Sequence, residues 1–343
     1  MPDTAHVAGG RDSVMGATAR AGANVALVKY WGKRSSEKNL PAVGSISLTL
    51  SGLVATARVE VDSRGARFRS RGEPVDGVAG ERMTGFLDWL AERLGVEARF
   101  CTDVAATFPV GAGLASSAAI HCAVAAAASS ACGARVGLRE LSRLARVGSG
   151  SAARSVYGGW VEWHRGTRDD GEDSDAEQLH SEDVWPVALL VAVAEEGKKD
   201  VPSRDAMEHV TATSPLFAGW VAAQDGDLEA MRRAIAARDL RAVGTIAEEN
   251  CLRMHATCLA ARPPVFYWTP ATLAAIQRVR ELRGSGCDAY FTIDAGPQVK
   301  VVCAPQDADA VAEGLATVPG ISRVLRSGAG PGVEITDGAI PWR

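Results

Sequence analysis

The chain has 343 residues, of which 47% are hydrophobic and 23% are charged, so it is long enough to bury one or two sizeable cores and has no compositional sign of disorder. Its formal net charge of -4 and its pI near 5.9 argue against a nucleic-acid-binding surface, although a local basic pocket is compatible with both values. The sequence therefore predicts a compact soluble protein that binds any phosphate group locally.

The cysteines and histidines form no pattern that is typical of a metal site. The seven cysteines contain no CxxC pair and lie mostly inside apolar runs, as reduced core residues of a cytoplasmic protein do. The six histidines form no HExxH motif, so zinc is not expected. The long uncharged stretch over residues 104–134 is mainly alanine, and residues 1–20 look like a flexible tail without an apolar signal core. We therefore expect a cytoplasmic chain with no membrane contact.

Residues 22–34, GANVALVKYWGKR, place two lysines and two aromatic residues after an apolar, strand-like run. Lys29 falls on one face of the predicted strand and Lys33 lies just beyond it, so both ammonium groups could converge on an anionic ligand. An edge strand with solvated lysines explains this segment alone equally well. Hydrophobic spacing further predicts strands over residues 25–28, 45–50 and 56–61 and a helix over residues 80–94, and hence an α+β first half.

Residues 108–120, FPVGAGLASSAAI, combine glycines with two serines ahead of an alanine-rich run. The glycines permit a tight turn, Ser116 and Ser117 can cap a helix, and alanine favours a helix after them. A glycine-rich loop that opens a helix is an anion site, because the free N–H groups and the positive end of the helix dipole point at the same place. Neither a Walker A motif nor a complete GxGxxG is present.

Residues 146–163 repeat this theme, with Ser149 and Ser151 on either side of Gly150 beside another predicted helix start. Arg154 could present its guanidinium to a carboxylate. Taken alone, Arg154 is better explained as a surface ion-pair partner, but with two other anion-friendly segments it becomes a ligand candidate.

An acidic stretch over residues 168–185 is the clearest change of composition, with eight acidic residues between Asp169 and Asp183. We interpret it as a solvated loop or a connection between domains. Beyond it, the pattern predicts a strand at 187–193, helices between 207 and 261, and a strand pair at 289–293 and 299–303 that is joined by the turn 294–297.

In this order, the segments resemble the GHMP kinase superfamily and, within it, the diphosphomevalonate decarboxylases. NVALVKYWGK is similar to the substrate-binding opening of that family, the segment 109–119 to the phosphate loop of the superfamily, and RVGSGSAARSVYGGW to a signature of the decarboxylases. Segments 203–207, 254–257 and 290–297 resemble the bacterial branch, and the resemblance extends roughly over residues 24–332.

The resemblance implies an α+β fold with two lobes and an active site in the cleft between them. The N-terminal GHMP kinase-like domain, over residues 21–185, would have a βαβ core like that of a ribosomal protein and carry the ATP phosphate loop, and an α/β half over 186–343 would carry the catalytic aspartate. The implied enzyme is a cytoplasmic homodimer that uses ATP with Mg²⁺.

The activity that the resemblance implies is the ATP-dependent decarboxylation of mevalonate 5-diphosphate to isopentenyl diphosphate, through phosphorylation of the 3-hydroxyl, in the mevalonate pathway of isoprenoid biosynthesis. A decarboxylase or kinase of the same superfamily that acts on mevalonate 5-phosphate or a related 3-hydroxy acid is the alternative. A catalytically silent nucleotide-binding regulator is a further alternative, which the presence of Asp294, Lys29 and Arg154 disfavours.

Carried over residue by residue, the resemblance implies that Asp294 acts on the 3-hydroxyl, that Lys29 keeps Asp294 ionised, and that Arg154 grips the substrate carboxylate. It implies no particular Mg²⁺ ligand. The implied substrate-binding residues are Ala26, Tyr30, Lys33, Ser149, Gly150, Ser151, Ser203, Arg204, Met207 and Ala295. The implied ATP-binding residues are Pro109, Gly111, Ala112, Gly113, Leu114, Ala115, Ser116 and Ser117. The chain departs from the family at Val43 and Gly44, where an Asn-Ser pair is usual, and so lacks two polar side chains beside the expected cleft.

Overall fold

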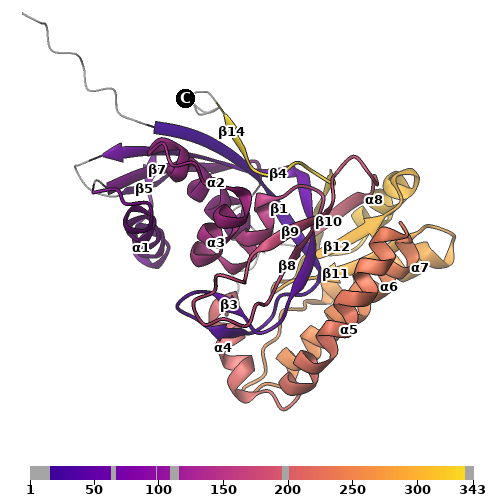
Figure 1. The fold of residues 1–343 in the computed structure, drawn as a ribbon. Coiled ribbons are helices and arrows are strands. Elements are labelled where there is room, and N and C mark those ends of the chain that lie inside the picture. Colours follow the sequence, from indigo (N-terminus) through magenta and orange to yellow (C-terminus); the bar gives the residue numbers. More distant parts are fainter. Residues whose placement is uncertain (1–15, 63–66, 98, 109–115, 195–200, 337–343) are drawn as a thin grey trace, which may run out of the picture.

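Two β-sheets, with helices packed against and between them, make up the fold (Figure 1). The computed structural model describes residues 16–62, 67–97, 99–108, 116–194 and 201–336. The first sheet and a small hairpin contain β1 (Gly16–Val28), β2 (Lys33–Ser35), β3 (Leu40–Pro41), β4 (Ser45–Asp62), β5 (Arg67–Ser70), β6 (Glu73–Pro74), β7 (Arg99–Ala106), β8 (Trp160–Trp163), β9 (Ala176–His180) and β14 (Glu334–Thr336). The second sheet contains β10 (Ala188–Ala194), β11 (Ala289–Ile293), β12 (Val299–Cys303) and β13 (Ile321–Gly328). The helices are α1 (Gly77–Arg93), α2 (Ser116–Ala131), α3 (Leu138–Gly148), α4 (Ser203–Thr213), α5 (Phe217–Ala236), α6 (Leu240–Leu259), α7 (Pro270–Gly284), α8 (Ala308–Ala316) and the short 3-10 helices η1 (Gly150–Val156) and η2 (Pro305–Asp307).

The antiparallel pair of β1 and β4 forms the spine of the first sheet. The two strands predicted at 45–50 and 56–61 are one continuous strand, β4, because β1 pairs with it on both sides of the intervening residues. The register shifts between Gly22 and Asn24, and a Cβ atom at Gly22 would lie 2.5 Å from the carbonyl oxygen of Leu50. Glycine therefore permits the irregular crossing, after which β1 continues to Val28 and presents Lys29 at its end.

A βαβ unit continues this sheet beyond β4. The strands β5 and β7 are parallel, and α1 lies between them in the chain, as the sequence predicted for residues 80–94. The helix α2 packs across β1 and β4 and buries all of its alanines. These small side chains let the helix approach the sheet closely, and alanine also has the highest helix propensity. The expected ATP-binding residues 109–115, immediately before α2, lie outside the described residues.

The second sheet has the strand order β11-β12-β10-β13. Its strands β11 and β12 have the predicted bounds, and the turn between them is closed by a 2.8 Å hydrogen bond from the Gly296 N–H to the carbonyl oxygen of Asp294. The helix α6 contacts both β1 and β11, one strand from each sheet. This packing explains why the residues that follow these two strands, Lys29 and Asp294, meet although they are far apart in the sequence.

Both ends of the described chain differ from the sequence expectation. The strand β1 begins at Gly16, so residues 16–20, which were expected in the flexible tail, are part of the first sheet. The strand β14, at residues 334–336, pairs with β1 and therefore returns to the first sheet although it was expected in the C-terminal half. Within the described residues, no helix combines the length and apolar character needed to cross a bilayer.

The acidic stretch is not simply a solvated loop. It includes β9, and the side chain of Asp175 is only 4% exposed, with one carboxylate oxygen 2.7 Å from Nε of Arg139 on α3. The buried guanidinium of Arg146, also on α3, donates a hydrogen bond to the carbonyl oxygen of Gly171. The composition concealed this packing because the basic partners lie about thirty residues earlier in the chain, as the separations of 36 and 25 residues show.

Candidate active site

Asp294 lies directly after β11 and is held there by the helix that joins the two sheets. Cys251 and His255, both on α6, contact the backbone of Ile293, the residue before Asp294. The Ile293 N–H donates to Sγ of Cys251 over 3.1 Å, and Nε2 of His255 is 3.2 Å from the Ile293 carbonyl oxygen. Burial lowers the pKa of His255 to about 3, so its ring is neutral at neutral pH and can donate through Nε2. The end of β11 is thus anchored by neutral groups.

Two buried lysines contact the Asp294 carboxylate. Nζ of Lys29 lies 2.6 Å from Oδ1, and Nζ of Lys300, on β12, lies 3.2 Å from Oδ2. Lys29 also donates to the carbonyl oxygen of Ala26 over 2.9 Å, which fixes the direction of its ammonium group. Burial raises the pKa of Asp294, but the two lysines outweigh it and hold this pKa well below its ordinary value. The carboxylate is therefore ionised throughout the physiological range, and its side chain is 26% exposed, whereas both lysines are almost fully buried.

Arg154 is buried, contrary to a surface position, and donates only to neutral oxygens among the residues that the structure describes. Nη1 bonds Oγ of Ser45 over 2.5 Å, and Nη2 bonds Oδ1 of Asn24 over 2.9 Å. Nε bonds Oγ of Ser47 over 2.9 Å. Burial lowers the pKa of Arg154 to about 10, and the charge of Asp294 acts in the opposite direction. The guanidinium stays charged at neutral pH and has no direct carboxylate partner among the described residues. A carboxylate ligand would therefore neutralise its buried charge.

Tyr30 lines the same region with an unpaired hydroxyl. Its ring packs edge-on against Trp163, with the ring centroids 4.8 Å apart, and its buried hydroxyl has no hydrogen-bond partner among the described residues. A Cβ atom at Gly150 would lie 2.7 Å from that hydroxyl, so the absence of a side chain at Gly150 makes room for it. A buried hydroxyl without a partner is costly, and a bound polar ligand would satisfy it.

Lys33 and Arg204 form a second cationic group. Burial, and then the charge of Arg204, lower the pKa of Lys33 to about 8, and Nζ of Lys33 donates to the neutral Oδ1 of Asn39 over 2.7 Å. Arg204 lies in the first turn of α4, next to Ser203, and its charge also acts on Tyr30. Two neighbouring cations are suited to a polyanion such as a diphosphate.

Hydroxyl groups gather where α2 begins. Oγ of Ser149 donates to Oγ of Ser117 over 3.4 Å and lies 3.4 Å from Oγ of Ser151, so the segments 108–120 and 146–163 meet here. Ser116 is the first residue of α2, whose N-terminal N–H groups and dipole favour an anion. The structure therefore brings the expected ATP-binding serines beside two expected substrate-binding serines.

The remaining expected residues contribute backbone or apolar surface. Met207 and Ala295 belong to a core cluster that also includes Val43, and Ala26 contributes the carbonyl oxygen that Lys29 contacts. At the position where the family pattern is lost, the carbonyl oxygen of Gly44 accepts a hydrogen bond from Gln224, and a Cβ atom there would lie 2.8 Å from Leu228. Packing against α5 therefore takes the place of the expected polar side chains.

Sequence reasoning missed several residues that hold this centre together. Lys300 is the most important of them, and a signal was available: a single lysine in the apolar run VKVVC, where a buried ammonium needs an anionic partner. Asn24 orients Arg154, and Oδ1 of Asn250 accepts the Lys29 backbone N–H over 2.8 Å. These amides carried no local signal, because their partners are 130 and 221 residues away.

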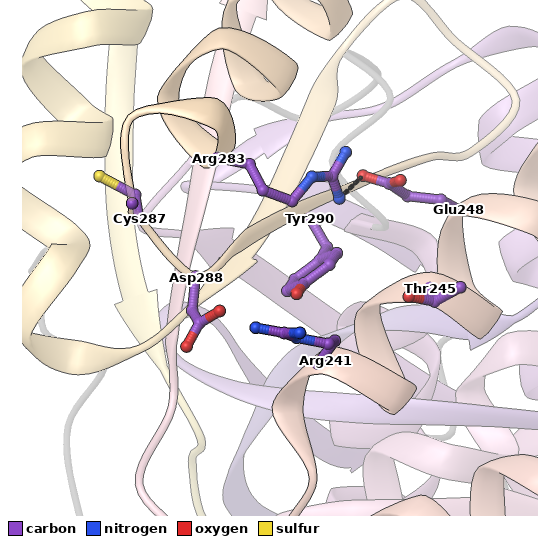
Figure 2. A pocket seen from close by; sticks show the side chains of 8 residues that line it. Arg241, Thr245, Glu248, Arg283, Cys287, Asp288 and Tyr290 are labelled. Atoms are coloured by element: carbon purple, nitrogen blue, oxygen red, sulfur yellow. Dashed lines mark hydrogen bonds and ion pairs between the residues drawn. The ribbon is translucent and has the colours of Figure 1, made fainter.

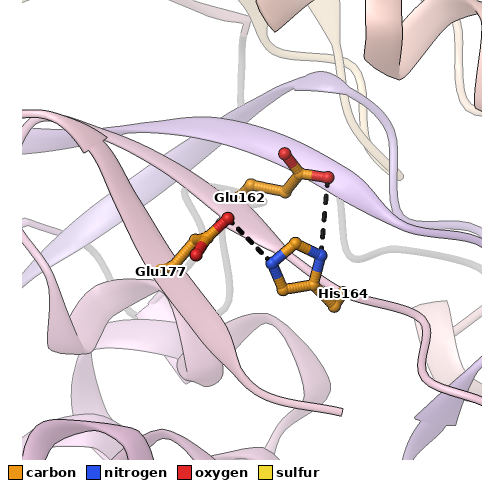
Figure 3. A group of neighbouring side chains, drawn as sticks. All are labelled: Glu162, His164 and Glu177. Atoms are coloured by element: carbon orange, nitrogen blue, oxygen red, sulfur yellow. Dashed lines mark ion pairs between the residues drawn. The ribbon is translucent and has the colours of Figure 1, made fainter. Parts of the chain in front are cut away.

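A cluster of possible metal ligands lies elsewhere in the first sheet. Figure 3 shows Glu162 and His164 beside Glu177, with ligand atoms that all lie within 4.8 Å of one another. The two ring nitrogens of His164 point at different carboxylates, and both oxygens of Glu162 already accept hydrogen bonds from Arg232 on α5. Mg²⁺ prefers oxygen ligands to imidazole, so this cluster does not match the site expected for Mg²⁺ with ATP.

A cavity of about 530 Å³ opens at the other end of β11. Figure 2 shows the Arg283 guanidinium close to the Tyr290 ring and paired with Glu248. Asp288 precedes β11 and Asp294 follows it, so the two lie about 20 Å apart along an extended strand. The cavity is therefore separate from the Asp294 centre. Its lining residues are Arg241, Thr245, Glu248, Arg283, Gly286, Cys287, Asp288 and Tyr290.

Comparison with known proteins gives matches along the whole length of the fold. The diphosphomevalonate decarboxylase-like N-terminal domain matches residues 21–176, and the mevalonate 5-diphosphate decarboxylase C-terminal domain matches residues 189–326. The chain is 35% identical to diphosphomevalonate decarboxylase mvd1 of Aspergillus fumigatus over 324 residues, which cover 88% of this chain and 80% of that protein.

Solved structures match equally well. The crystal structure of mevalonate diphosphate decarboxylase from Staphylococcus aureus superimposes with a TM-score of 0.90 at 35% identity, covering 95% of this chain and 99% of that one. A structure described as MDDEF in complex with MVAPP, AMPPCP and magnesium gives a TM-score of 0.89 at 36% identity, covering 95% and 100%.

Proposed function

The chain belongs to the diphosphomevalonate decarboxylase family, and we propose that it uses ATP to convert mevalonate 5-diphosphate into isopentenyl diphosphate at the Asp294 centre. The family matches confirm the resemblance expected from the sequence, and the superposition confirms the two-lobed, GHMP kinase-like α+β fold. One observation carries the placement of the reaction. Asp294 lies between two buried lysines with the charge of Arg154 nearby, so cations outnumber carboxylates, and an anionic substrate would supply the missing negative charge.

The chemistry explains why this reaction needs a phosphoryl donor. The 3-hydroxyl of the substrate is a poor leaving group until the γ-phosphoryl group of ATP is transferred to its oxygen, which releases ADP. The C3–O bond then breaks and phosphate leaves with its electron pair. The electrons of the C1–C2 bond form the C2–C3 double bond as carbon dioxide departs. The site must therefore bind a carboxylate and orient a hydroxyl group.

Asp294 fits the second of these tasks. Each of its oxygens contacts a lysine. Of the three side chains, Asp294, Lys29 and Lys300, only that of Asp294 is substantially exposed. In this proposal, the ionised carboxylate accepts a hydrogen bond from the 3-hydroxyl, aims its oxygen at the phosphoryl donor and receives the proton as the O–P bond forms. Lys29 keeps the carboxylate ionised and offsets the negative charge of the transferring group.

Arg154 and the Lys33 group would hold the two ends of the substrate. The buried guanidinium of Arg154 can add the substrate carboxylate to its neutral partners without a change of protonation. The paired cations Lys33 and Arg204 suit the diphosphate. The Tyr30 hydroxyl, which has no hydrogen-bond partner among the described residues, lies close to both regions, because the charges of Arg154 and Arg204 both act on it. In this assignment, Ser149, Gly150, Ser151, Ser203, Met207, Ala295 and Ala26 complete the substrate site.

ATP would bind at the N-terminus of α2, with Mg²⁺ neutralising its phosphates. The hydroxyl groups of Ser117, Ser149 and Ser151 are oxygen donors of the kind that Mg²⁺ accepts, which supports this location. Bound Mg²⁺ would supply positive charge for phosphoryl transfer that the serines cannot provide. Turnover should disappear in excess chelator and return with added Mg²⁺, whereas turnover that persists in chelator would refute the requirement.

We also propose the two domains expected from the sequence, at 21–185 and 186–343, with residues 16–20 and β14 assigned to the N-terminal domain because both pair in the first sheet, in a cytoplasmic homodimer. The family matches at 21–176 and 189–326 support the division. Light scattering of the purified chain tests the dimer: a mass of one chain, about 36 kDa, would refute it, given the chain mass of 35.8 kDa.

Product analysis tests the proposed activity. The purified chain is incubated with ATP, Mg²⁺ and either mevalonate 5-diphosphate or mevalonate 5-phosphate, and ADP and the unsaturated product are quantified in parallel. We expect isopentenyl diphosphate from the diphosphate and much slower turnover of the monophosphate, because Lys33 and Arg204 would bind the extra phosphate. Faster turnover of the monophosphate would instead assign the chain to the alternative substrate.

A further inference from the structure

Lys300 is a buried lysine of β12 that forms an ion pair with the partly exposed Asp294. Its side chain is 1% exposed and lies on the opposite face of β12 from Val299 and Val301, on the face where Val302 joins the large core cluster that includes the first sheet. Placing an ammonium group in such a core is costly unless an anion accompanies it. A neutral side chain of similar length would fill this space without that cost, so the retained charge needs an explanation other than packing.

The β11-β12 hairpin determines where the Lys300 ammonium lies. Lys300 pairs with Thr292 in the antiparallel register, two residues before Asp294. Lys29 comes from a different sheet and contacts Oδ1, whereas Lys300 contacts Oδ2. A single ion pair to one oxygen leaves the carboxylate free to rotate, but two contacts on two oxygens from two independent strands fix its plane.

We propose that Lys300 is a positioning residue, which holds Oδ2 of Asp294 so that the carboxylate presents one fixed orientation to the substrate hydroxyl. The inference deepens the proposed function and rests on the role given there to Asp294. Lys300 itself is too buried to contact substrate, so it acts through Asp294.

The other groups around Asp294 do not replace Lys300. Lys29 occupies the opposite oxygen, and Arg154 is bound to asparagine and serine oxygens. Burial raises the pKa of Cys251 and lowers that of His255, so both are neutral at neutral pH. Among these groups, Lys300 is the one whose ion-pair contact with the carboxylate is to Oδ2, at 3.2 Å.

A double-mutant cycle separates positioning from packing. The four proteins are the wild type, Lys300→Met, Asp294→Asn and the double variant. Each is measured for kcat, for the KM of mevalonate 5-diphosphate and of ATP, and for its thermal midpoint. In the wild-type background we expect Lys300→Met to lower kcat by about 10-fold to 100-fold, with the KM for ATP changed by less than about threefold. In the Asp294→Asn background the same substitution should lower kcat by less than about threefold, because the carboxylate that Lys300 positions is already gone.

The thermal midpoints provide a readout that needs no activity. Lys300→Met should lower the midpoint when Asp294 is present, and should raise it in the Asp294→Asn background, because there it removes a buried ammonium that has lost its carboxylate. An equal kinetic loss and an equal drop in midpoint in both backgrounds would show that Lys300 acts by packing and would overturn the inference. If wild type itself does not turn over mevalonate 5-diphosphate, the proposed function fails, while the sign of the midpoint change still decides the pairing. Should Lys300→Met alone be insoluble, comparison of Asp294→Asn with the double variant decides the same question.

Discussion

Two largely buried carboxylates of this chain, Asp294 and Glu162, lie in opposite electrostatic settings. Asp294 contacts two lysines, with a third cation, Arg154, close by, and its side chain reaches the surface. Glu162 is 2% exposed, is held by both Nε and Nη2 of Arg232, and has a second carboxylate, Glu177, near it. Cations are in excess in the first setting and carboxylates in the second. The first setting is incomplete without an anionic ligand. In the second, Arg232 bonds both oxygens of Glu162 and so ties β8 to α5, and the additional carboxylate, Glu177, is 60% exposed to solvent.

Asp294→Asn should produce the largest loss, because it keeps the size of the side chain but removes the charge between the lysines. We expect kcat to fall about 100-fold to 10,000-fold, the usual range for loss of a general base, with little change in nucleotide affinity. Steady-state kinetics and nucleotide titration measure the two quantities. A near wild-type rate would remove Asp294 from the reaction, and accumulation of a 3-phosphorylated acid would place its role after phosphoryl transfer.

Arg154→Lys keeps the charge and tests the geometry of the cation. Arg154 uses three nitrogens on Asn24, Ser45 and Ser47, and a lysine cannot reproduce this fork. We expect kcat/KM to fall about 100-fold, which is the loss of one or two charge-assisted hydrogen bonds in the transition state. Values near those of wild type would show that only the charge matters and would remove the proposed clamp on the carboxylate.

Lys33→Ala should affect binding more than chemistry. We expect KM for the diphosphate to rise about 10-fold while kcat changes less, because a charge on a distant phosphate acts similarly on ground and transition states. Lys33 has a pKa lowered to about 8 and loses its charge as pH rises through that value, so wild-type KM should increase above pH 8. The variant should show a flatter profile there. An unchanged KM with a large loss of kcat would move Lys33 into the chemical step.

Glu162→Gln should have the smallest effect on activity and a modest one on stability. It weakens the link between β8 and α5 by about 1 kcal/mol, a value reduced because Arg232 is 44% exposed. Denaturant unfolding measures the loss, and kcat of the folded fraction should stay within about twofold of wild type. The control is Glu229→Gln, whose exposed pair with Arg233 should contribute almost nothing. A large kcat loss for Glu162→Gln would show that the group around Glu162 also takes part in catalysis.

The sequence predicted the strands and helices that carry strong local patterns, and it pointed to the loops in which the candidate site lies. The bounds of β11 and β12, the helix after Ser116 and the meeting of Lys29 with Asp294 were all available from the spacing or from the family resemblance. The joined strand β4 was missed because Gly52 interrupts its pattern, although pairing with β1 continues past it. Local periodicity cannot report pairing between distant segments.

The same limit explains the missing parts of the site. Lys300 was overlooked because its strand was read only for its hydrophobic character, and Asn24 and Asn250 because their partners come from other elements of the fold. The structure identifies Asn24 and Asn250 through contacts between segments that are more than a hundred residues apart, and Lys300 through its contact with Asp294 across the β11-β12 hairpin.

The most direct test of the account is a single-turnover experiment with excess enzyme, in which ADP and carbon dioxide are measured from the same quenched samples. The cation-rich Asp294 centre is proposed to transfer the phosphoryl group and then release both phosphate and the carboxyl group. We therefore predict one carbon dioxide and one isopentenyl diphosphate for each ADP. Stoichiometric ADP with a stable 3-phosphorylated product and no carbon dioxide would make this chain a kinase and contradict the account.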